Sequence, residues 1–443
     1  MRRSRNDLRA RSLAPLLIVG LLTVACSTMP TPEPAPAPSP TPTEQVEEVV
    51  LVLGSWRPDD VEQMNRILDR FHEEHEAITV RFEPTNPPDY DDALQAQLKS
   101  GTAPDLFYVR SFATSRMQFE QGYLEPLDDI PGLQTQFQPE MLAAWATDEG
   151  LPYAVPFIAT SHGIYYNQEV FADLDLAPPA TWQGLLSIAQ TIKDAGMVPF
   201  ANTSGDPWTI AELLFMNLAP GFIGGRDGRL AYLEGERCFD DQQIVDAFRA
   251  VAELDPYLPV NHGLLTYADS RELFVQGQAA MFMSGSWDIA FLEASEPDFA
   301  WSVFGTPPPV GRPAHVTFHP DAGIALNAAS RHKEEAKAFL SWMTSADCAE
   351  ALANELPGFF PMQRETPEIT NHHARAFLSL NEDRDTDARF AWEKLREGSP
   401  DGYALMQDAA LAVLEGEQTP QEAAEALQTG LAQWFDAAQT CRN

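Results

Sequence analysis

Aromatic and charged side chains stand close together at three places in the sequence. The pairs are Trp56 with Arg57, Asp206 with Trp208, and Trp287 with Asp288. The flat face of an indole can stack on a ligand, and carboxylate and guanidinium groups can exchange hydrogen bonds with it. This combination is typical of a site that binds a small polar molecule. The elements that carry these residues decide whether they can act together.

Sequence motifs for catalysis and metal binding are absent. The segment His72-Glu73-Glu74-His75 imitates a metal pair, but neither the His-x-x-Glu-His nor the His-Glu-x-x-His spacing is met. The sequence has no Gly-x-Ser-x-Gly turn and no phosphate-binding loop, and the glycine-rich residues 221–228 are predicted to form an ordinary loop. We therefore expect no catalytic residue, no metal and no cofactor, although 65 carboxylates leave a glycosidase pair open.

The stretch of residues 274–288 predicts where Trp287 lies. Gly277 is typical of a helix end, and residues 279–283 form a short apolar run that suits a strand buried on both faces. Gly285 then releases Trp287 at the carboxyl end of that strand, which is where open α/β sheets bind ligands. Trp287 is therefore either a ligand contact or an ordinary aromatic residue of the core.

Apolar periodicity predicts alternating strands and helices. Residues 49–56 and 78–82 are predicted strands, and residues 61–75 between them have helical spacing. This β-α-β opening implies a parallel sheet. Later strands or extended segments are predicted at 103–109, 151–156, 163–167, 301–307 and 323–326, and helices at 182–195, 208–218 and 333–343, with a mostly helical tail after 346.

The N-terminus has the features of an export signal. Arginines precede an apolar run at residues 13–25, which is too short for a membrane span. The residues before Cys26 resemble a bacterial lipobox, with Thr23 in place of the usual leucine. We therefore expect a signal peptide over residues 1–25, a lipid on Cys26, and an extended proline-rich linker up to residue 45.

Composition narrows the classes of protein that remain. About 400 residues after the linker exceed one hydrophobic core, so two lobes are expected. A formal net charge of −36 argues against nucleic acid as a partner. Besides Cys26 the chain has Cys238, Cys348 and Cys441, of which two can form a disulfide outside the cytoplasm; the sequence does not choose the pair, and the spacing fits no metal site.

Seven sequence blocks in order resemble the extracellular solute-binding proteins of ABC importers, the large family that includes maltose-binding protein and many sugar receptors. They are spread over the whole chain after the linker. The blocks are residues 98–105, 122–127, 153–156 with 165–167, Thr181-Trp182 with Gly196 and Pro199, 274–287, 330–340, and 414–423.

The resemblance implies an α/β protein with the type II, two-lobed periplasmic-binding-protein fold. In this fold crossing strands form a hinge between the lobes, and the ligand binds in the central cleft. Lobe one would hold residues 46–157 and 300–345, and lobe two residues 158–299 and 346–443. The three remaining cysteines would then lie in lobe two, where a disulfide would not lock the hinge.

The resemblance also implies a lipid-anchored, monomeric receptor on the extracytoplasmic face of a bacterial cell membrane. It would capture a sugar or oligosaccharide and deliver it to a two-subunit permease driven by a cytoplasmic ATPase. Trp287 aligns with a tryptophan that stacks on ligand in several relatives. The predicted ligand contacts are Trp56, Arg57, Arg110, Asp206, Trp208, Trp287, Asp288, His319, Asp321 and Phe359.

Several alternatives stay open on the sequence alone. Arg110 could form a salt bridge, Asp206 could cap a helix, Trp208 could pack in the core, and His162 could be structural. The acidity also suits a receptor for a cationic ligand such as a polyamine, which would bind through carboxylates. An exported glycan-active enzyme and a sensory module for a membrane kinase are further alternatives.

Overall fold

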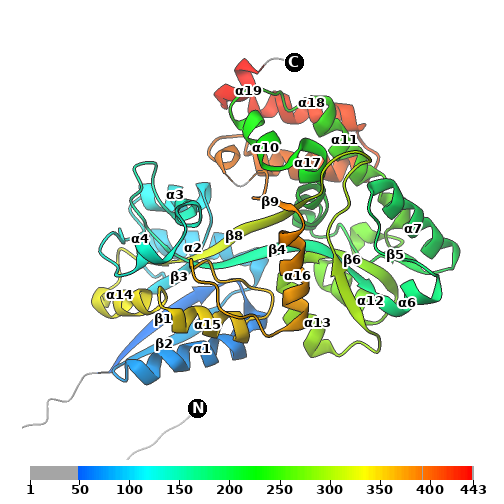
Figure 1. Cartoon of the computed structure of the whole chain (residues 1–443). Helices are drawn as coiled ribbons and strands as arrows, with labels where there is room; N and C mark the ends of the chain where they lie inside the picture. The colour runs from blue at the N-terminus through cyan, green and yellow to red at the C-terminus, as the bar shows by residue number, and fades with distance from the viewer. Residues whose placement is uncertain (1–47, 392, 442–443) are drawn as a thin grey trace, which may run out of the picture. The chain divides into compact units, whose positions relative to one another are not determined.

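The computed structural model describes residues 48–391 and 393–441 (Figure 1). The predicted signal peptide, the lipidation site Cys26 and the proline-rich linker lie outside these residues. Within the described part of the chain, no helix combines the length and the apolar character that a membrane span requires.

The described chain begins with the predicted β-α-β unit. β1 (Val49–Ser55) and β2 (Ile78–Pro84) pair in parallel and are connected by α1 (Val61–Glu74), while β3 (Leu106–Arg110) pairs in parallel with the other edge of β1. The carboxyl ends of these strands therefore lie at one edge of the sheet. α1 packs on the sheet because its apolar residues recur at helical spacing; the buried ones are Met64, Ile67, Leu68 and Phe71.

Two long strands connect this parallel unit with the rest of the sheet. β4 (Val155–Asn167) pairs antiparallel with β8 (His315–Leu326) over its first half and with β6 (Ala279–Gly285) over its second half. β8 also pairs antiparallel with β3, and the strand order is β2-β1-β3-β8-β4-β6-β5. Figure 1 shows β4 and β8 side by side. They are the crossing strands of the molecule.

Buried apolar residues form two separate clusters. The first includes residues of the β-α-β unit and of α14 (Lys333–Trp342). The second includes residues of α7 (Trp182–Asp194), α11 (Gln242–Ala252) and α17 (Gly402–Leu414). The first cluster also includes residues of the crossing strands and of β6. Two hydrophobic clusters in an α/β chain of this size agree with the two-lobed fold that was predicted.

Helix α15 (Ala346–Glu355) contributes buried residues to the first cluster. It packs against α1, because Cys348, Ala351 and Leu352 recur at helical spacing and form one buried face. The predicted division into lobes, with residues 346–443 in lobe two, stays a prediction.

The remaining elements complete the two clusters. The helix predicted at 208–218 is divided into α8 (Pro207–Thr209), a π-helical segment (Ile210–Phe215) and α9 (Met216–Ile223). The prediction of a loop at residues 221–228 is wrong. The end of α9 and the start of α10 (Gly225–Leu233) occupy these residues, and Gly224 separates the two helices at φ 93°. The other elements are α2 (Pro87–Ser100), α3 (Ala113–Glu120), α4 (Leu133–Gln136), α5 (Pro139–Leu142), α6 (Gln168–Asp173), β5 (Val198–Phe200), α12 (Tyr267–Val275), α13 (Ile289–Ser295), β7 (Trp301–Phe304), α16 (His372–Glu382), β9 (Asp385–Asp387), α18 (Pro420–Leu431) and α19 (Asp436–Thr440).

A disulfide joins Cys238 to Cys441, whose Cα atoms lie 5.2 Å apart across 203 residues of sequence. It attaches the end of α19 to the segment between α10 and α11. Cys348 is a buried free thiol, and burial raises its pKa to about 12. The structure thus settles the pairing that the sequence left open.

Reduction of this disulfide is expected to lower the free energy of unfolding by about 2–5 kcal/mol, because the unfolded chain is released from a large closed loop. Denaturant unfolding with and without a phosphine reductant measures the loss. The Cys238→Ser/Cys441→Ser variant is the matched control and should not respond to reductant. Rapid labelling of Cys348 in the folded protein, or a reductant response of the double variant, would contradict these assignments.

Candidate ligand-binding site

Trp287 lies directly after a buried strand, as predicted. Every residue of β6 is buried, and the chain then turns through Ser286–Asp288 into α13. A Cβ atom at Gly285 would lie 1.9 Å from Cζ3 of Trp287, so the indole rests against a backbone position that has no room for a side chain. Trp287 is 9% exposed, and its ring meets His162 edge to face with centroids 5.1 Å apart. The turn therefore fixes the position of the ring.

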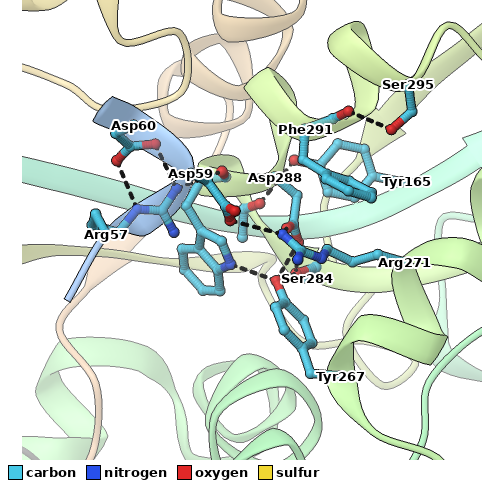
Figure 2. A network of polar contacts seen from close by, with 12 residues as sticks. Arg57, Asp59, Asp60, Tyr165, Tyr267, Arg271, Ser284, Asp288, Phe291 and Ser295 are labelled. Carbon is cyan, nitrogen blue, oxygen red and sulfur yellow. Dashed lines mark hydrogen bonds and ion pairs between the residues drawn. The ribbon is translucent and has the colours of Figure 1, made fainter. Parts of the chain in front are cut away.

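Tyr267 links Trp287 to Asp288 (Figure 2). Nε1 of Trp287 donates a hydrogen bond to the Tyr267 hydroxyl at 2.8 Å, and this hydroxyl donates to Oδ2 of Asp288 at 2.5 Å. The Ser284 hydroxyl donates to the same carboxylate oxygen at 2.5 Å. Burial raises the pKa of Asp288, against the opposing effect of nearby Arg271. Asp288 is thus a buried acceptor that orients Tyr267 and, through it, the indole.

The predicted pair Asp206 and Trp208 joins the same network. The Asp206 carboxylate accepts a hydrogen bond from the backbone N–H of Tyr267 at 2.8 Å. It therefore caps the start of α12, whereas its own helix α8 has no side-chain cap. The Trp208 ring lies edge-on to Tyr267, with centroids 4.8 Å apart. Trp208, Tyr267 and Trp287 thus form a connected aromatic group, which we call the tryptophan network.

Residues that follow β1 contact the tryptophan network from the predicted first lobe. The Arg57 guanidinium binds both carboxylate oxygens of Asp60, at 2.7 and 2.9 Å, and its Nη2 lies 3.4 Å from the carbonyl oxygen of Trp287. Nη1 of Arg271 donates to Asp59 at 3.0 Å. Figure 2 shows Arg57 and Asp60 at the left and Tyr267 and Arg271 at the right. Polar contacts therefore connect residues of the two predicted lobes at this point.

A second group, the ion cluster, consists of Arg389, Glu212 and Asp321. Arg389 Nε lies 2.9 Å from Glu212, and its Nη1 lies 3.3 Å from Asp321. All three residues are buried, and they come from the segment after β9, the π-helical segment and β8. The guanidinium carbon also lies 5.8 Å from the centre of the Trp287 ring. The ion cluster and the tryptophan network are therefore neighbours.

Trp56 and Arg110 are brought together at the carboxyl ends of β1 and β3. The guanidinium carbon of Arg110 lies 3.8 Å above the Trp56 ring, a cation–π contact, and Nε lies 3.5 Å from Asp91. Burial acts to lower the pKa of Arg110, but the carboxylates of Asp91, Asp321 and Glu212 raise it overall. Arg110 is therefore attracted electrostatically by the same carboxylates, Glu212 and Asp321, that pair with Arg389.

His319 and Phe359 are more deeply enclosed. Nε2 of His319 lies 3.1 Å from the Thr160 hydroxyl and Nδ1 lies 3.0 Å from the carbonyl oxygen of Pro320, so both ring nitrogens have protein partners. Burial lowers the pKa of His319 and of the neighbouring His162, which keeps both rings neutral. Phe359 is 2% exposed and lies under the Arg57 guanidinium at 4.9 Å. His319 and Phe359 are therefore enclosed by protein partners.

Sequence reasoning missed Tyr267, Arg271, Glu212 and Arg389. Tyr267 and Arg271 lie four residues apart on α12, so they share a helix face just before the predicted stretch. This spacing was a sequence signal that could have predicted both residues as neighbours in the site. Glu212 and Arg389 are brought together only by long-range packing. The ten predicted contact residues lie in or beside the two groups, and their contact with a ligand stays a prediction.

A family model for bacterial extracellular solute-binding proteins matches residues 55–349, which is more than half of the chain. The chain belongs to this family. Members of the family are binding proteins and not enzymes, as expected from the missing catalytic motifs. The match begins at the last residue of β1 and includes the crossing strands, β6 and Trp287 of this solute-binding protein.

Curated relatives are similar over most of the chain. An uncharacterized ABC transporter extracellular-binding protein of Pyrococcus horikoshii is 23% identical over 82% of this chain and 82% of its own length. The maltotriose-binding protein of Pyrococcus abyssi is 25% identical over 73% of this chain and 69% of its own length. The multiple sugar-binding protein of Streptococcus mutans is 23% identical over 64% of this chain and 68% of its own length.

Solved structures share the fold of this solute-binding protein. A chitin oligosaccharide binding protein aligns with a TM-score of 0.74 and 21% identity, over 86% of this chain and 98% of its own. The solute-binding protein RafE in complex with raffinose aligns with a TM-score of 0.71 and 21% identity, over 89% of this chain and 100% of its own. At this level of identity the likeness concerns the two-lobed fold.

Proposed function

We propose that this solute-binding protein captures a sugar or oligosaccharide for an ABC importer, and that the ligand binds beside the tryptophan network and the ion cluster. The observation that carries the proposal is the position of Trp287. It follows a buried strand, it is held by Tyr267, and its backbone is contacted by Arg57 from the predicted first lobe. Relatives named as maltotriose-binding and multiple sugar-binding proteins support the substrate class.

The residues around Trp287 suit the chemistry of a polyhydroxylated ligand. The site holds indole rings at positions 56, 208 and 287, and guanidinium groups lie beside two of them, Arg110 beside Trp56 and Arg389 beside Trp287. Because these groups come from both predicted lobes, a ligand that touches both would favour the closed arrangement. Closure is thus proposed to follow from ligand binding.

The remaining parts of the proposal concern the cell surface. A lipid on Cys26 and the proline-rich linker would hold the two lobes clear of the bilayer, on the extracytoplasmic side. The partner would be a membrane permease, and the receptor would act as a monomer. Mass spectrometry of the membrane-extracted protein would detect the lipid on Cys26.

Calorimetry against a panel of mono- and oligosaccharides tests the substrate class. We expect binding to at least one oligosaccharide, with a smaller radius of gyration by solution scattering when it is bound. A panel without any binding would contradict the sugar proposal. A polyamine series is the matched control for the cationic alternative.

The carboxylates at the site favour the sugar over a cationic ligand. Glu212 and Asp321 are already paired with Arg389, and Asp288 accepts two hydroxyl donors. A polyamine would have to displace these partners. We therefore expect no binding of spermidine or putrescine in the same calorimetric experiment.

A further inference from the structure

We propose that Glu293, His372 and His373 bind a transition-metal ion of the zinc class, at a site separate from the ligand site. Glu293 lies on α13, and the two histidines are the first residues of α16. One potential ligand atom of each residue lies within 4.8 Å of the other two. None of the three belongs to the tryptophan network or the ion cluster.

Hydrogen bonds and ring packing already orient two of the three side chains. Nδ2 of Asn371 donates to both carboxylate oxygens of Glu293, at 2.8 and 3.0 Å. Nδ1 of His373 lies 2.7 Å from Oε1 of Glu293, and its ring is stacked on Trp301 with centroids 3.4 Å apart. Asn371 is thus an outer partner that orients the carboxylate, as metal sites commonly have, and a bound ion would take the place of the hydrogen bond between His373 and Glu293.

The donor set selects the class of metal. Two imidazoles and one carboxylate suit zinc and similar ions, whereas calcium and magnesium prefer oxygen ligands only. Ligands of tetrahedral zinc lie about 3.3 Å apart, since each bond is about 2.0–2.1 Å. The ligand atoms here lie up to 4.8 Å apart, and the exposed side chain of His372 can rotate to shorten its distance to the other two. The protein supplies three ligands, and water would supply the fourth.

A pocket beside the two histidines gives such an ion access to solvent. Its volume is about 390 Å³, and its walls include Gln168, Trp301 and Ser302 together with His372 and His373. Both imidazoles therefore line the same pocket. The rings of His372 and His373 have centroids only 3.7 Å apart.

The proposed ion would connect two functional parts of the fold. α13 directly follows the turn that carries Trp287. α16 packs against β4, where the Ser161 hydroxyl donates to Asn381 at 3.2 Å. A bound ion would therefore attach the segment after Trp287 to a helix that lies on a crossing strand, and it should raise the melting temperature.

Titration calorimetry with zinc chloride tests the site on the purified full chain, treated with a chelator and carrying no polyhistidine tag. We expect one zinc per chain at pH 7.5, weaker binding near pH 5.5 because imidazole ligands must be neutral, and no comparable binding of calcium or magnesium. Cobalt(II) in place of zinc should give the intense visible absorption of a tetrahedral site. His372→Ala and Glu293→Gln should each weaken zinc binding at least tenfold.

The segment of residues 72–75 provides the matched control, since His72→Ala/His75→Ala removes two histidines elsewhere on the surface. This variant should bind zinc like the wild type. Equal loss in the control variant, or unchanged zinc binding of His372→Ala, would overturn the proposal. His372 is exposed and its removal should leave the fold intact, which the circular dichroism spectrum checks. Oligosaccharide affinity is measured separately, so failure of the metal site does not bear on the proposed function.

Discussion

Trp287→Ala is expected to lower the affinity for the best oligosaccharide of the panel about 100-fold, which corresponds to about 2.7 kcal/mol. The indole lies next to the charged groups of the site, and Tyr267 holds it in place. Truncation removes both the stacking surface and the donor to Tyr267. Calorimetry well below the melting temperature measures the change on folded protein.

A buried tryptophan outside the site is the control for this experiment. Trp342 is 5% exposed, and its Nε1 donates to Glu74 at 3.0 Å in the first cluster. Trp342→Ala should cost about 3–5 kcal/mol of stability, as large-to-small substitutions in cores do, with oligosaccharide affinity unchanged. If Trp287→Ala behaves like Trp342→Ala in both measurements, Trp287 is a core residue and the binding interpretation is wrong.

Arg389→Met is expected to lower the free energy of unfolding by about 3–5 kcal/mol, because it leaves Glu212 and Asp321 as buried carboxylates without their shared guanidinium. The same change should weaken oligosaccharide binding, since Arg389 lies near the Trp287 ring. Urea unfolding followed by fluorescence and circular dichroism measures the stability.

The triple variant Arg389→Met/Glu212→Gln/Asp321→Asn distinguishes lost charge pairing from lost packing. Removal of all three charges should recover most of the stability, because replacing a whole buried ion group is often nearly neutral. A loss below about 1 kcal/mol for Arg389→Met alone would mean that the ion cluster contributes no more than an exposed pair.

Local sequence patterns predicted much of the fold. The β-α-β unit, α7, α14 and the buried strand before Trp287 all follow from periodicity and from glycine at the element ends. The glycine-rich residues 221–228 show where this reasoning fails. Buried apolar residues of α9 hold the helix in place up to Gly224, so tertiary packing outweighs the low helix propensity of glycine.

The site was predictable only in part, because some of its residues meet through long-range packing. Trp56, Arg57 and Trp287 follow strands, and strand ends can be read from local patterns. Arg389 and Glu212 meet across 177 residues of sequence, and no local pattern marks either of them. Helix α15 belongs to the first cluster for the same kind of long-range reason: its partner α1 lies almost 300 residues earlier.

Gly285 has a consequence for how the specificity of this receptor can change. A methyl group at this position would occupy space that the Trp287 ring now fills, so even the smallest side chain would displace the ring. A substitution at a residue that itself offers no side chain to a ligand could then alter which ligand is accepted. Under the proposed function, a single substitution at position 285 would therefore change the surface that Trp287 presents to the ligand, and with it the ligand preference.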